Sequence, residues 1–385
     1  MSLKDKIRRR ETSGPDFQKP LFDKFGVLEN PFPSAGQPLG HPHLQTNIDE
    51  KVISAIQEFE NSYKTQVLVI EGTQGVGKTN LLNYYQSELE ELYQEDKTFY
   101  IIRYYPDPEP SFDAIIRRVF QEMGEKHLRE IAHKLCDLNP EERSSIIDKS
   151  KNHEARLVLH ALSKCAESKN ENIDFVLEAA MEWLLGLRLL NKHRFFLGVR
   201  FRLDTVESKT QVLRDIIYVS VELKILGGIF LLLDELEKQD YSLSTTPVLR
   251  YLLAIRALID ALPTHLFLMM ALTPDARLRY FRMLPAIAGR LQNVYTLSPL
   301  EDDKIAFSLY KRYLQEARKK AVSDPNGGQM KAKPVDIFER EEIIKIFKDL
   351  SEKSEEKGIQ GVTHRDFLNE LHLKTQDLFK IFQPS

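Results

Sequence analysis

A glycine-rich segment that ends in lysine and threonine carries the residue types with the clearest chemistry. It reads Gly72-Thr73-Gln74-Gly75-Val76-Gly77-Lys78-Thr79 and fits the pattern G-x-x-x-x-G-K-[ST] in full. Glycines let backbone N–H groups approach a phosphate closely. The Lys78 ammonium can reach the β- and γ-phosphate oxygens, and the Thr79 hydroxyl can bind Mg²⁺. The segment therefore predicts a binding site for a nucleoside triphosphate.

The sequence on either side of this segment fits the same prediction. Residues 66–71 form a short apolar run that is typical of a buried strand, and a helical pattern begins at Asn80. A strand, a glycine-rich turn and a helix N-terminus together make a cradle for phosphate, because the N–H groups and the helix dipole both favour an anion there.

Hydrolysis needs an acid that holds Mg²⁺ and a second polar group that orders the attacking water. The run Leu231-Leu232-Leu233 is followed directly by Asp234 and Glu235. We expect Asp234 to bind Mg²⁺, mostly through water, and Glu235 to act as general base or to position the water. Glu237 is a weaker candidate for the metal because it lies farther beyond the expected strand.

A hydroxyl and several arginines could complete the site. Thr273 follows an apolar run at 265–271, where it could contact the γ-phosphate or the attacking water, or cap a helix before Pro274. Charge on the phosphoryl oxygens in the transition state favours a guanidinium. The main candidates are Arg290 and Arg365, and the alternatives are Arg277, Arg279 and Arg282.

The positioning elements alternate between strands and helices, which predicts an α/β fold with a parallel five-stranded sheet flanked by helices. We expect strands at 66–71, 98–104, 229–233, 265–271 and 294–297. Residues 125–225 are helical in pattern and form a large insertion. The predicted domains are a flexible basic arm at 1–19, a nucleotide-binding domain at 20–299 and an all-helical lid subdomain at 300–385.

Bulk composition bounds the function further. The chain has 385 residues, 42% of them hydrophobic, and a net charge of −3. No global basic field demands nucleic acid, although a local patch would suffice for DNA. Neither cysteine lies in a C-x-x-C pattern, and no apolar run is long enough for a membrane span. We therefore expect a cytoplasmic protein without a metal scaffold or a membrane partner.

Three groups of residues suggest nucleic-acid contacts but have more ordinary interpretations. The cations of the arm at 1–19 fit a solvated tail slightly better than a phosphate-contacting arm. The run Arg318-Lys319-Lys320 ends a helix, where cations suit the dipole. The aromatic pairs Tyr104-Tyr105 and Phe195-Phe196 are interpreted as core or strand residues rather than base-stacking platforms.

Taken in order, these features resemble an AAA+ ATPase over roughly residues 25–375. The segment Gly72–Thr79 resembles the Walker A motif, and Leu231–Glu235 resembles the Walker B motif. By position, Thr273 is similar to the sensor-1 residue, Arg290 to the arginine finger and Arg365 to the sensor-2 arginine. The resemblance implies ATP and Mg²⁺ as ligands and a homo-oligomer, such as a ring.

Within that class the chain is most similar to the initiator-like branch, which includes origin-recognition ATPases, transposon ATPases and the ATP-binding proteins of bacteriophage-exclusion (BREX) systems. In those last proteins the residue before the arginine is often proline, whereas here it is His364. Four local stretches carry the resemblance: Asn30-Pro31-Phe32, Trp183-Leu184-Leu185-Gly186, Leu232-Leu233-Asp234-Glu235-Leu236-Glu237 and Gly361-Val362-Thr363-His364-Arg365-Asp366-Phe367-Leu368.

The resemblance implies an ATP-hydrolysing switch or motor that acts on DNA, double-stranded by expectation, or on a DNA-bound partner from the same system. DNA would then be bound by the arm, the insertion or an assembled ring. Two other functions stay open. One is a signalling NTPase that controls an effector protein without binding DNA, and the other is an ATP-binding scaffold that does not hydrolyse.

Overall fold

The computed structural model describes the chain except for residues 1–14, 35–40, 106–112, 168–172, 238–244, 325–332, 357–360 and 383–385. The chain divides into two compact units. We call the first the sheet unit, which comprises Asn47–Glu71 and Tyr84–Thr296. The second, the terminal unit, comprises Met1–Thr46, Gly72–Asn83 and Leu297–Ser385.

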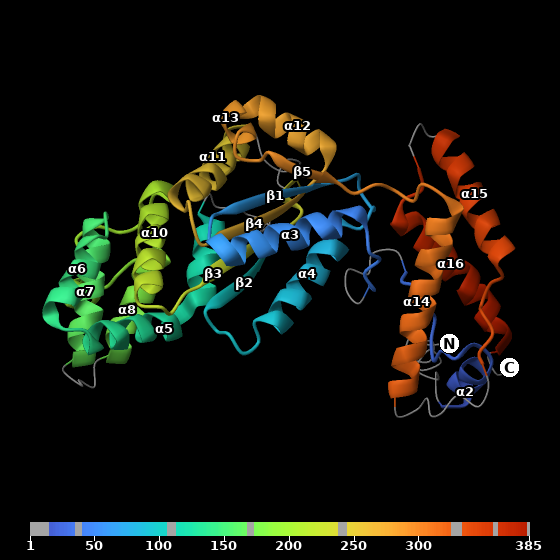
Figure 1. Ribbon diagram of the computed structural model, residues 1–385, viewed down its shortest axis with the longest axis horizontal. Coiled ribbons are helices and arrows are strands. Elements are labelled where there is room, and N and C mark those ends of the chain that lie inside the picture. The colour runs from blue at the N-terminus through green and yellow to red at the C-terminus, as the bar shows by residue number, and fades with distance from the viewer. Residues whose placement is uncertain are drawn as a thin grey trace, which may run out of the picture. The chain divides into compact units, whose positions relative to one another are not determined.

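The sheet unit is built on five parallel strands (Figure 1). The strand order is β2-β3-β4-β1-β5, and every neighbouring pair is parallel. This confirms the predicted α/β fold of the P-loop NTPase class and the five expected strands. Their bounds are β1 (Gln66–Glu71), β2 (Phe99–Tyr104), β3 (Gly228–Leu233), β4 (Leu266–Leu272) and β5 (Asn293–Thr296).

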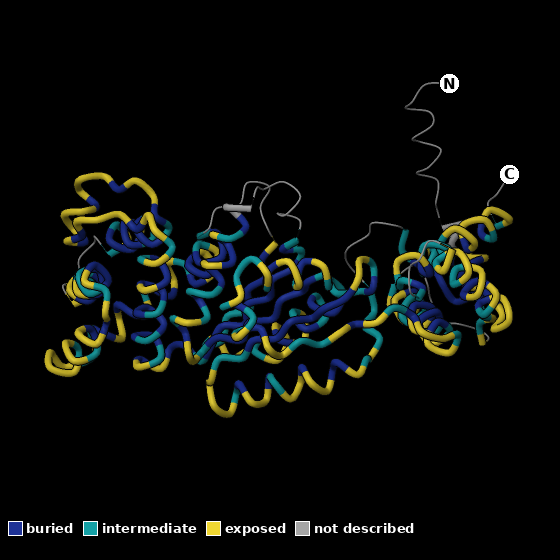
Figure 2. Tube along the Cα trace, turned by 90° about the horizontal axis from the view of Figure 1, so that it is seen from above, coloured by how far each residue is buried: buried dark blue, intermediate teal, exposed yellow. Residues whose placement is uncertain are grey.

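The central strands β3 and β4 are buried along their whole length, because helices cover both faces of the sheet (Figure 2). On one face, the Phe59 ring packs edge-on against Phe230 and Phe267, with ring centroids 5.2 and 5.7 Å apart. The helices of the sheet unit are α3 (Asn47–Ser62), α5 (Ala114–Asp137), α6 (Pro140–Asp148), α7 (His153–Glu167), α8 (Ile173–Leu184), α9 (Asn191–Leu197), α10 (Val206–Glu222), α11 (Thr245–Ala261), α12 (Pro274–Met283) and α13 (Pro285–Ala288).

The predicted helical insertion is present as α5–α10, between β2 and β3. It has no separate core. Leu231 and Leu233 of β3 belong to the same hydrophobic cluster as Leu162 of α7 and Trp183 of α8. The insertion is therefore continuous with the packing behind the sheet. Removing the Trp183 side chain would disturb both, since large-to-small core changes cost several kcal/mol, about 3–5 for an aromatic.

The terminal unit has its own core, formed by α14 (Asp303–Ser323), α15 (Arg340–Glu356), α16 (His364–Phe379) and the short η2 (Lys380–Phe382). Residues near the N-terminus contribute to it. The Phe25 ring stacks on Phe379 and the Phe32 ring on Tyr310. The domain predicted at 20–299 therefore does not coincide with the sheet unit. Residues 20–46 belong to the terminal unit, because their aromatic side chains are buried by the C-terminal helices.

The predicted arm at 1–19 also differs in part from the structure. The helix α2 (Pro15–Phe25) begins before residue 19, and Leu21 and Phe25 bury its apolar side in the core of the terminal unit. Burial of this apolar side in the terminal unit stabilises a helix that is short by itself. Residues 1–14, with the clustered cations, lie outside the described residues.

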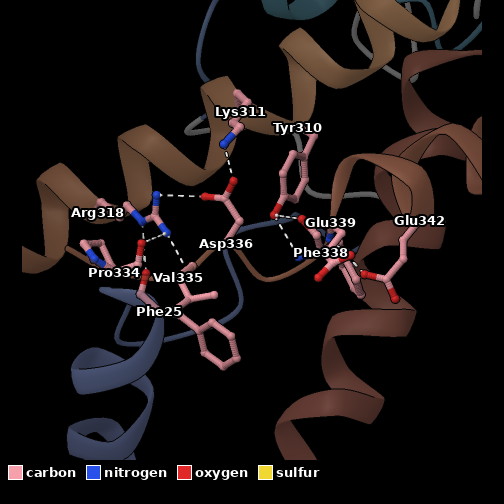
Figure 3. Close-up of polar contacts among 10 residues, drawn as sticks. All are labelled: Phe25, Tyr310, Lys311, Arg318, Pro334, Val335, Asp336, Phe338, Glu339 and Glu342. Carbon is pink, nitrogen blue, oxygen red and sulfur yellow. Dashed lines mark hydrogen bonds and ion pairs between the residues drawn. The ribbon is translucent and has the colours of Figure 1, made fainter. Parts of the chain in front are cut away.

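Arg318 shows how the basic run at the end of α14 is used (Figure 3). Its guanidinium donates to the Phe25 carbonyl at 3.0 Å and to the Val335 carbonyl at 2.7 Å. It also pairs with Asp336 at 3.2 Å, and Lys311 pairs with the same carboxylate. Arg318 therefore stabilises the terminal unit through carbonyl and carboxylate contacts, in addition to its expected place near the end of a helix.

A buried histidine joins α5 to β2 and α10, and it should make folding sensitive to acid. The Ser220 hydroxyl donates to the Ile216 carbonyl, so its oxygen accepts from His127 Nε2 at 2.8 Å, while Nδ1 faces the Tyr100 hydroxyl at 3.0 Å. This arrangement satisfies the neutral ring. Burial lowers the pKa of His127 from 6.5 to about 4.

Because only the unfolded chain takes up this proton between those pKa values, stability should fall as the pH drops from about 6.5 to about 4. The expected slope is up to ~1.4 kcal/mol per pH unit from His127. Urea unfolding at several pH values should show a flatter dependence in His127→Gln. The exposed His133→Gln on the same helix is the control, and an equal flattening there would contradict the assignment.

Candidate functional site

The glycine-rich loop has a backbone that requires glycine at defined positions. Gly75 and Gly77 have φ values of 86° and 101°, in the left-handed region that glycine tolerates best. A Cβ on Gly72 would lie 2.9 Å from the Leu297 carbonyl oxygen and 2.7 Å from Val76 Cγ2. The loop follows Glu71 of β1 directly, and α4 (Lys78–Leu92) begins at its end. The strand, loop and helix expected from the sequence are all present.

The Lys78 side chain folds back over the loop that precedes it. Its Nζ donates to the carbonyl oxygens of Gly72 at 2.8 Å and Thr73 at 3.1 Å. These bonds hold a positive charge over the loop, at the N-terminus of α4, where the helix dipole adds partial positive charge. An anion with several oxygens, such as a polyphosphate, suits this charge better than a neutral ligand does.

The strand register indicates at which edge of the sheet two predicted site residues lie. In the parallel register, Ile70 of β1 lies beside Ala271 of β4, and Leu233 of β3 lies beside Met270. Asp234 and Thr273 therefore follow their strands at the same edge. In open parallel sheets this is the edge where ligands bind.

Asp234 is buried, with 1% of its surface exposed, and its charge is compensated internally. Arg103 Nη2 donates to its Oδ2 at 2.7 Å, and the backbone N–H of Glu235 donates to its Oδ1 at 2.9 Å. The guanidinium lies 5.0 Å from the centroid of the Tyr105 ring. The acid that we expected to hold Mg²⁺ is thus in contact with a cation of the neighbouring strand.

Sequence reasoning missed Arg103. Its side chain is 6% exposed, and within the described residues its Nε and Nη1 are buried without a hydrogen-bond partner. Buried arginine nitrogens without partners are costly, so this arrangement needs a reason beyond folding. The available signal was one charged residue inside the otherwise uncharged strand Phe99–Tyr104, next to the strand that ends at Asp234.

Glu235 has a backbone conformation that is unusual for its residue type. Its φ is 52°, in the left-handed region, which costs a residue with a Cβ roughly 1–2 kcal/mol. Strained residues of this kind cluster at functional sites, because surrounding structure must hold them in place. The strain is consistent with a role that depends on where the carboxylate points, as expected of a general base.

Thr273 acts as a helix cap. It is the N-cap residue of α12, and its hydroxyl oxygen accepts the N–H of Ala276 at 3.3 Å. Of the two alternatives left open by the sequence, the cap is present. The hydroxyl can still donate its own proton, so contact with a phosphate or water stays a prediction.

Arg290 lies toward the opposite edge of the sheet. Asn293, three residues farther along the chain, pairs with Leu68 and donates to the Val67 carbonyl, near the amino end of β1. Arg290 pairs with Asp260 at 2.9 Å and donates to the Ala286 carbonyl at 3.2 Å. Among the alternatives, Arg277 pairs with Glu71 at the end of β1.

Arg365 contacts the glycine-rich loop through its backbone. Its N–H donates to the Gly75 carbonyl at 3.1 Å, and the neighbouring Thr363 caps α16 by accepting the Asp366 N–H at 3.1 Å. A Cβ on Gly75 would lie 3.2 Å from both Arg365 Cβ and Thr363 Oγ1. Burial lowers the pKa of His364 to about 4, so this helix start carries no imidazolium at neutral pH. Tertiary structure thus brings together Gly75 and Arg365, two predicted site residues that are far apart in the chain.

The predicted metal ligands fit Mg²⁺ by chemistry. Within the described residues, no group of three or more His, Cys, Asp or Glu side chains could hold a metal ion. Mg²⁺ is usually bound by one or two carboxylates together with substrate phosphates and waters. The Thr79 hydroxyl and the Asp234 carboxylate are oxygen donors of the kind it prefers.

Comparisons with known proteins add little. No protein-family model matches this chain, and no curated protein matches it. One solved structure, that of the ORC2 protein of Aeropyrum pernix in ADPNP-ADP complexes, aligns with 88% of this chain and 70% of its own, at 11% identity and a TM-score of 0.41. The fold assignment therefore stands on the strand order and the loop. In the described part of the chain, no helix is long and apolar enough to cross a membrane.

The Arg103–Asp234 pair can be tested by a double-mutant cycle. Arg103→Met leaves a buried carboxylate unpaired, which should cost about 3–5 kcal/mol of unfolding free energy. Adding Asp234→Leu should recover part of this loss, because both charges are then gone. Urea unfolding of the wild type, both single variants and the double variant measures the coupling. Strictly additive effects would mean that the two charges do not depend on each other.

Proposed function

We propose that this protein is a Mg²⁺-dependent ATPase of the AAA+ class. The observation that carries the proposal is the loop Gly72–Thr79, with its positive-φ glycines, between a parallel strand and a helix N-terminus. Asp234 and Glu235 at the carboxyl edge of the same sheet support hydrolysis rather than binding alone, because a pure binder has little need for a carboxylate held in a strained conformation.

Each residue has a defined part in the proposed reaction. The loop N–H groups and Lys78 bind the phosphates, and Thr79 and Asp234 hold Mg²⁺. The metal supplies charge neutralisation on the phosphate oxygens when bound. Glu235 accepts a proton from the attacking water or orients it. Arg103 donates to the buried Asp234 carboxylate and orients one of its oxygens.

The contact between Gly75 and Arg365 supports a further step, coupling between nucleotide and lid. The N–H of Arg365 binds the loop carbonyl directly, so a change of the loop on phosphate binding acts on the start of α16. We propose that the Arg365 side chain senses the γ-phosphate, the role of the sensor-2 residue that it resembles. Thr273 is proposed as the sensor-1 residue on its position after β4.

The position of Arg290 supports an oligomer. β1 has 6 residues, so its two ends are about 16 Å apart at ~3.3 Å per residue. A side chain near the amino end cannot serve a nucleotide at the carboxyl edge of its own sheet. We therefore propose that Arg290 acts on the nucleotide of a neighbouring copy in a homo-oligomer, such as a ring. Breaking the ion pair between Arg290 and Asp260 would cost little free energy, since exposed ion pairs contribute under about 1 kcal/mol.

We further propose that the assembled ATPase acts on DNA or a DNA-bound partner, within the initiator-like branch. The similarity of residues 361–368 and 232–237 to BREX ATP-binding proteins supports a role in phage defence. The alternative is a signalling NTPase whose nucleotide state presents the helical insertion to an effector. The continuous core between the insertion and β3 supports either, because both need the insertion to respond to the sheet.

Hydrolysis should depend on Glu235. Glu235→Gln should keep ATP binding and lower the turnover rate by 10²-fold or more, in line with the loss of a general base at about 10²–10⁴. ATP binding is measured by titration calorimetry and turnover by phosphate release. The exposed Glu178→Gln on α8 is the matched control. Unchanged turnover in Glu235→Gln would contradict the general-base assignment.

The same assay across a titration of duplex DNA, with particle size measured in parallel, decides between the functions. A DNA-stimulated rate supports action on DNA. ATP-dependent oligomers without DNA stimulation support the signalling alternative. No turnover at all would leave an ATP-binding scaffold.

Action in trans predicts complementation between two inactive variants. Arg290→Ala retains an intact loop, and Lys78→Ala retains Arg290, so mixed oligomers contain some sites with both residues. Phosphate release by the mixture should exceed that of either variant alone. If size measurement shows mixed oligomers and no rate returns, Arg290 does not act on a neighbour.

A further inference from the structure

The segment that joins α8 to α10 places bulky apolar side chains on the surface. We call residues 187–202 the aromatic–basic segment. The interpretation of Phe195-Phe196 as core or strand residues is wrong, because both lie in helix α9, where Phe195 is 83% exposed and Phe196 44%. Three further side chains of the segment are exposed: Leu187 at 47%, Leu190 at 56% and Phe201 at 71%.

The segment is anchored, so these side chains are held out by ordered backbone. Trp183 Nε1 donates to the Phe201 carbonyl at 3.0 Å. The Glu154 carboxylate accepts the N–H groups of Arg200 at 2.7 Å and Phe201 at 3.3 Å. A second set of side chains faces inward and is buried: Leu189, His193, Leu197, Val199 and Leu203. These buried side chains fill the inward side of the segment, so the exposed rings of Phe195 and Phe201 face solvent.

The charge of this segment is of one sign. From Trp183 to Leu203 the chain contains no Asp or Glu, although its overall net charge is −3. Five exposed cations lie there, and none forms an ion pair within the described part of the chain. Arg202 donates instead to the Gly186 carbonyl at 2.6 Å, and the Lys192 ammonium lies 4.8 Å from the Phe175 ring centroid. The cations are Arg188, Lys192, Arg194, Arg200 and Arg202.

Three buried or half-buried cations of the protein are used differently. Arg103, Lys209 and Arg318 each pair with a carboxylate within the fold. The exposed cations of the aromatic–basic segment are therefore available to an external anion. Exposed aromatic rings between them add a second requirement, because the anion must also offer flat apolar surface.

We propose that the aromatic–basic segment binds single-stranded nucleic acid. Phosphates meet the cations, and unpaired bases stack on the rings of Phe195 and Phe201. In a duplex the faces of the bases are covered by their neighbours, so the rings would have nothing to stack on. The site goes beyond the duplex contact expected above, because it assigns single-strand binding to the insertion, and it requires no ATP hydrolysis.

Two kinds of contact predict two separable effects. Loss of one stacked base weakens binding by about tenfold or more. Each phosphate contact contributes about −0.7 to the slope of log K against log salt for a single strand. Removing two cations should therefore make the slope shallower by about 1.4, while removing rings should leave it unchanged.

The test uses the full chain and fluorescence anisotropy with a labelled oligo-dT and a duplex of equal length. Phe195→Ala/Phe201→Ala should weaken oligo-dT binding at least tenfold with the salt slope retained. Arg194→Gln/Arg200→Gln should weaken binding and reduce the slope. Control variants remove an exposed apolar side chain and two exposed cations from the terminal unit: Ile381→Ala, and Lys345→Gln/Lys348→Gln on α15. Thermal unfolding confirms that these surface variants fold.

Several outcomes would overturn the proposal. They are equal effects of the control variants, tighter binding of duplex with no effect of the phenylalanine variants, or binding to vesicles of anionic lipid but not to oligo-dT. Repeating the titration with Glu235→Gln separates the two proposals. If the wild type binds oligo-dT but DNA does not stimulate its turnover, the proposal of a DNA-linked ATPase is overturned. The proposal for the aromatic–basic segment would still stand.

Discussion

The parallel pairing of β1, β4 and β3 is the constraint on which the rest of the structure depends. Parallel strands need helical crossovers, and these crossovers cover both faces of the sheet and bury β3 and β4 completely. The same pairing brings the carboxyl ends of all strands to one edge. The glycine-rich loop leaves β1 from that edge, and Asp234 follows β3 there. Arg290, near the other end of β1, is kept away from it by the length of a strand.

Burial at this edge explains the most unusual contact of the protein. A carboxylate that is 1% exposed is stable only with a compensating partner, and Arg103 on the neighbouring strand supplies it. Mg²⁺ needs the same carboxylate in the proposed reaction. In that proposal the guanidinium and the metal would share one acid, which would link folding of the sheet edge to nucleotide binding. The strained backbone of Glu235 lies directly beside this pair.

Burial also separates the two groups of basic residues in the chain. The cations at the end of α14 looked similar in sequence to those around α9, yet Arg318 ties α14 to the Phe25 and Val335 carbonyls, whereas the cations near Phe195 have no carboxylate partner among the described residues. Residues 20–46 show the same dependence on context. They precede β1 in the chain, but Phe25 and Phe32 are buried by the C-terminal helices.

The sequence by itself determined the features that depend on local chemistry. The glycine pattern, the apolar strands and the Asp-Glu pair after β3 were all readable, because turn geometry and strand burial leave short signals in neighbouring residues. Tertiary structure alone decided the contact of Arg103 with Asp234, the N–H of Arg365 on Gly75, and which rings of the insertion stay outside. These depend on residues far apart in the chain, and a side chain's type does not tell which surface its neighbours will leave uncovered.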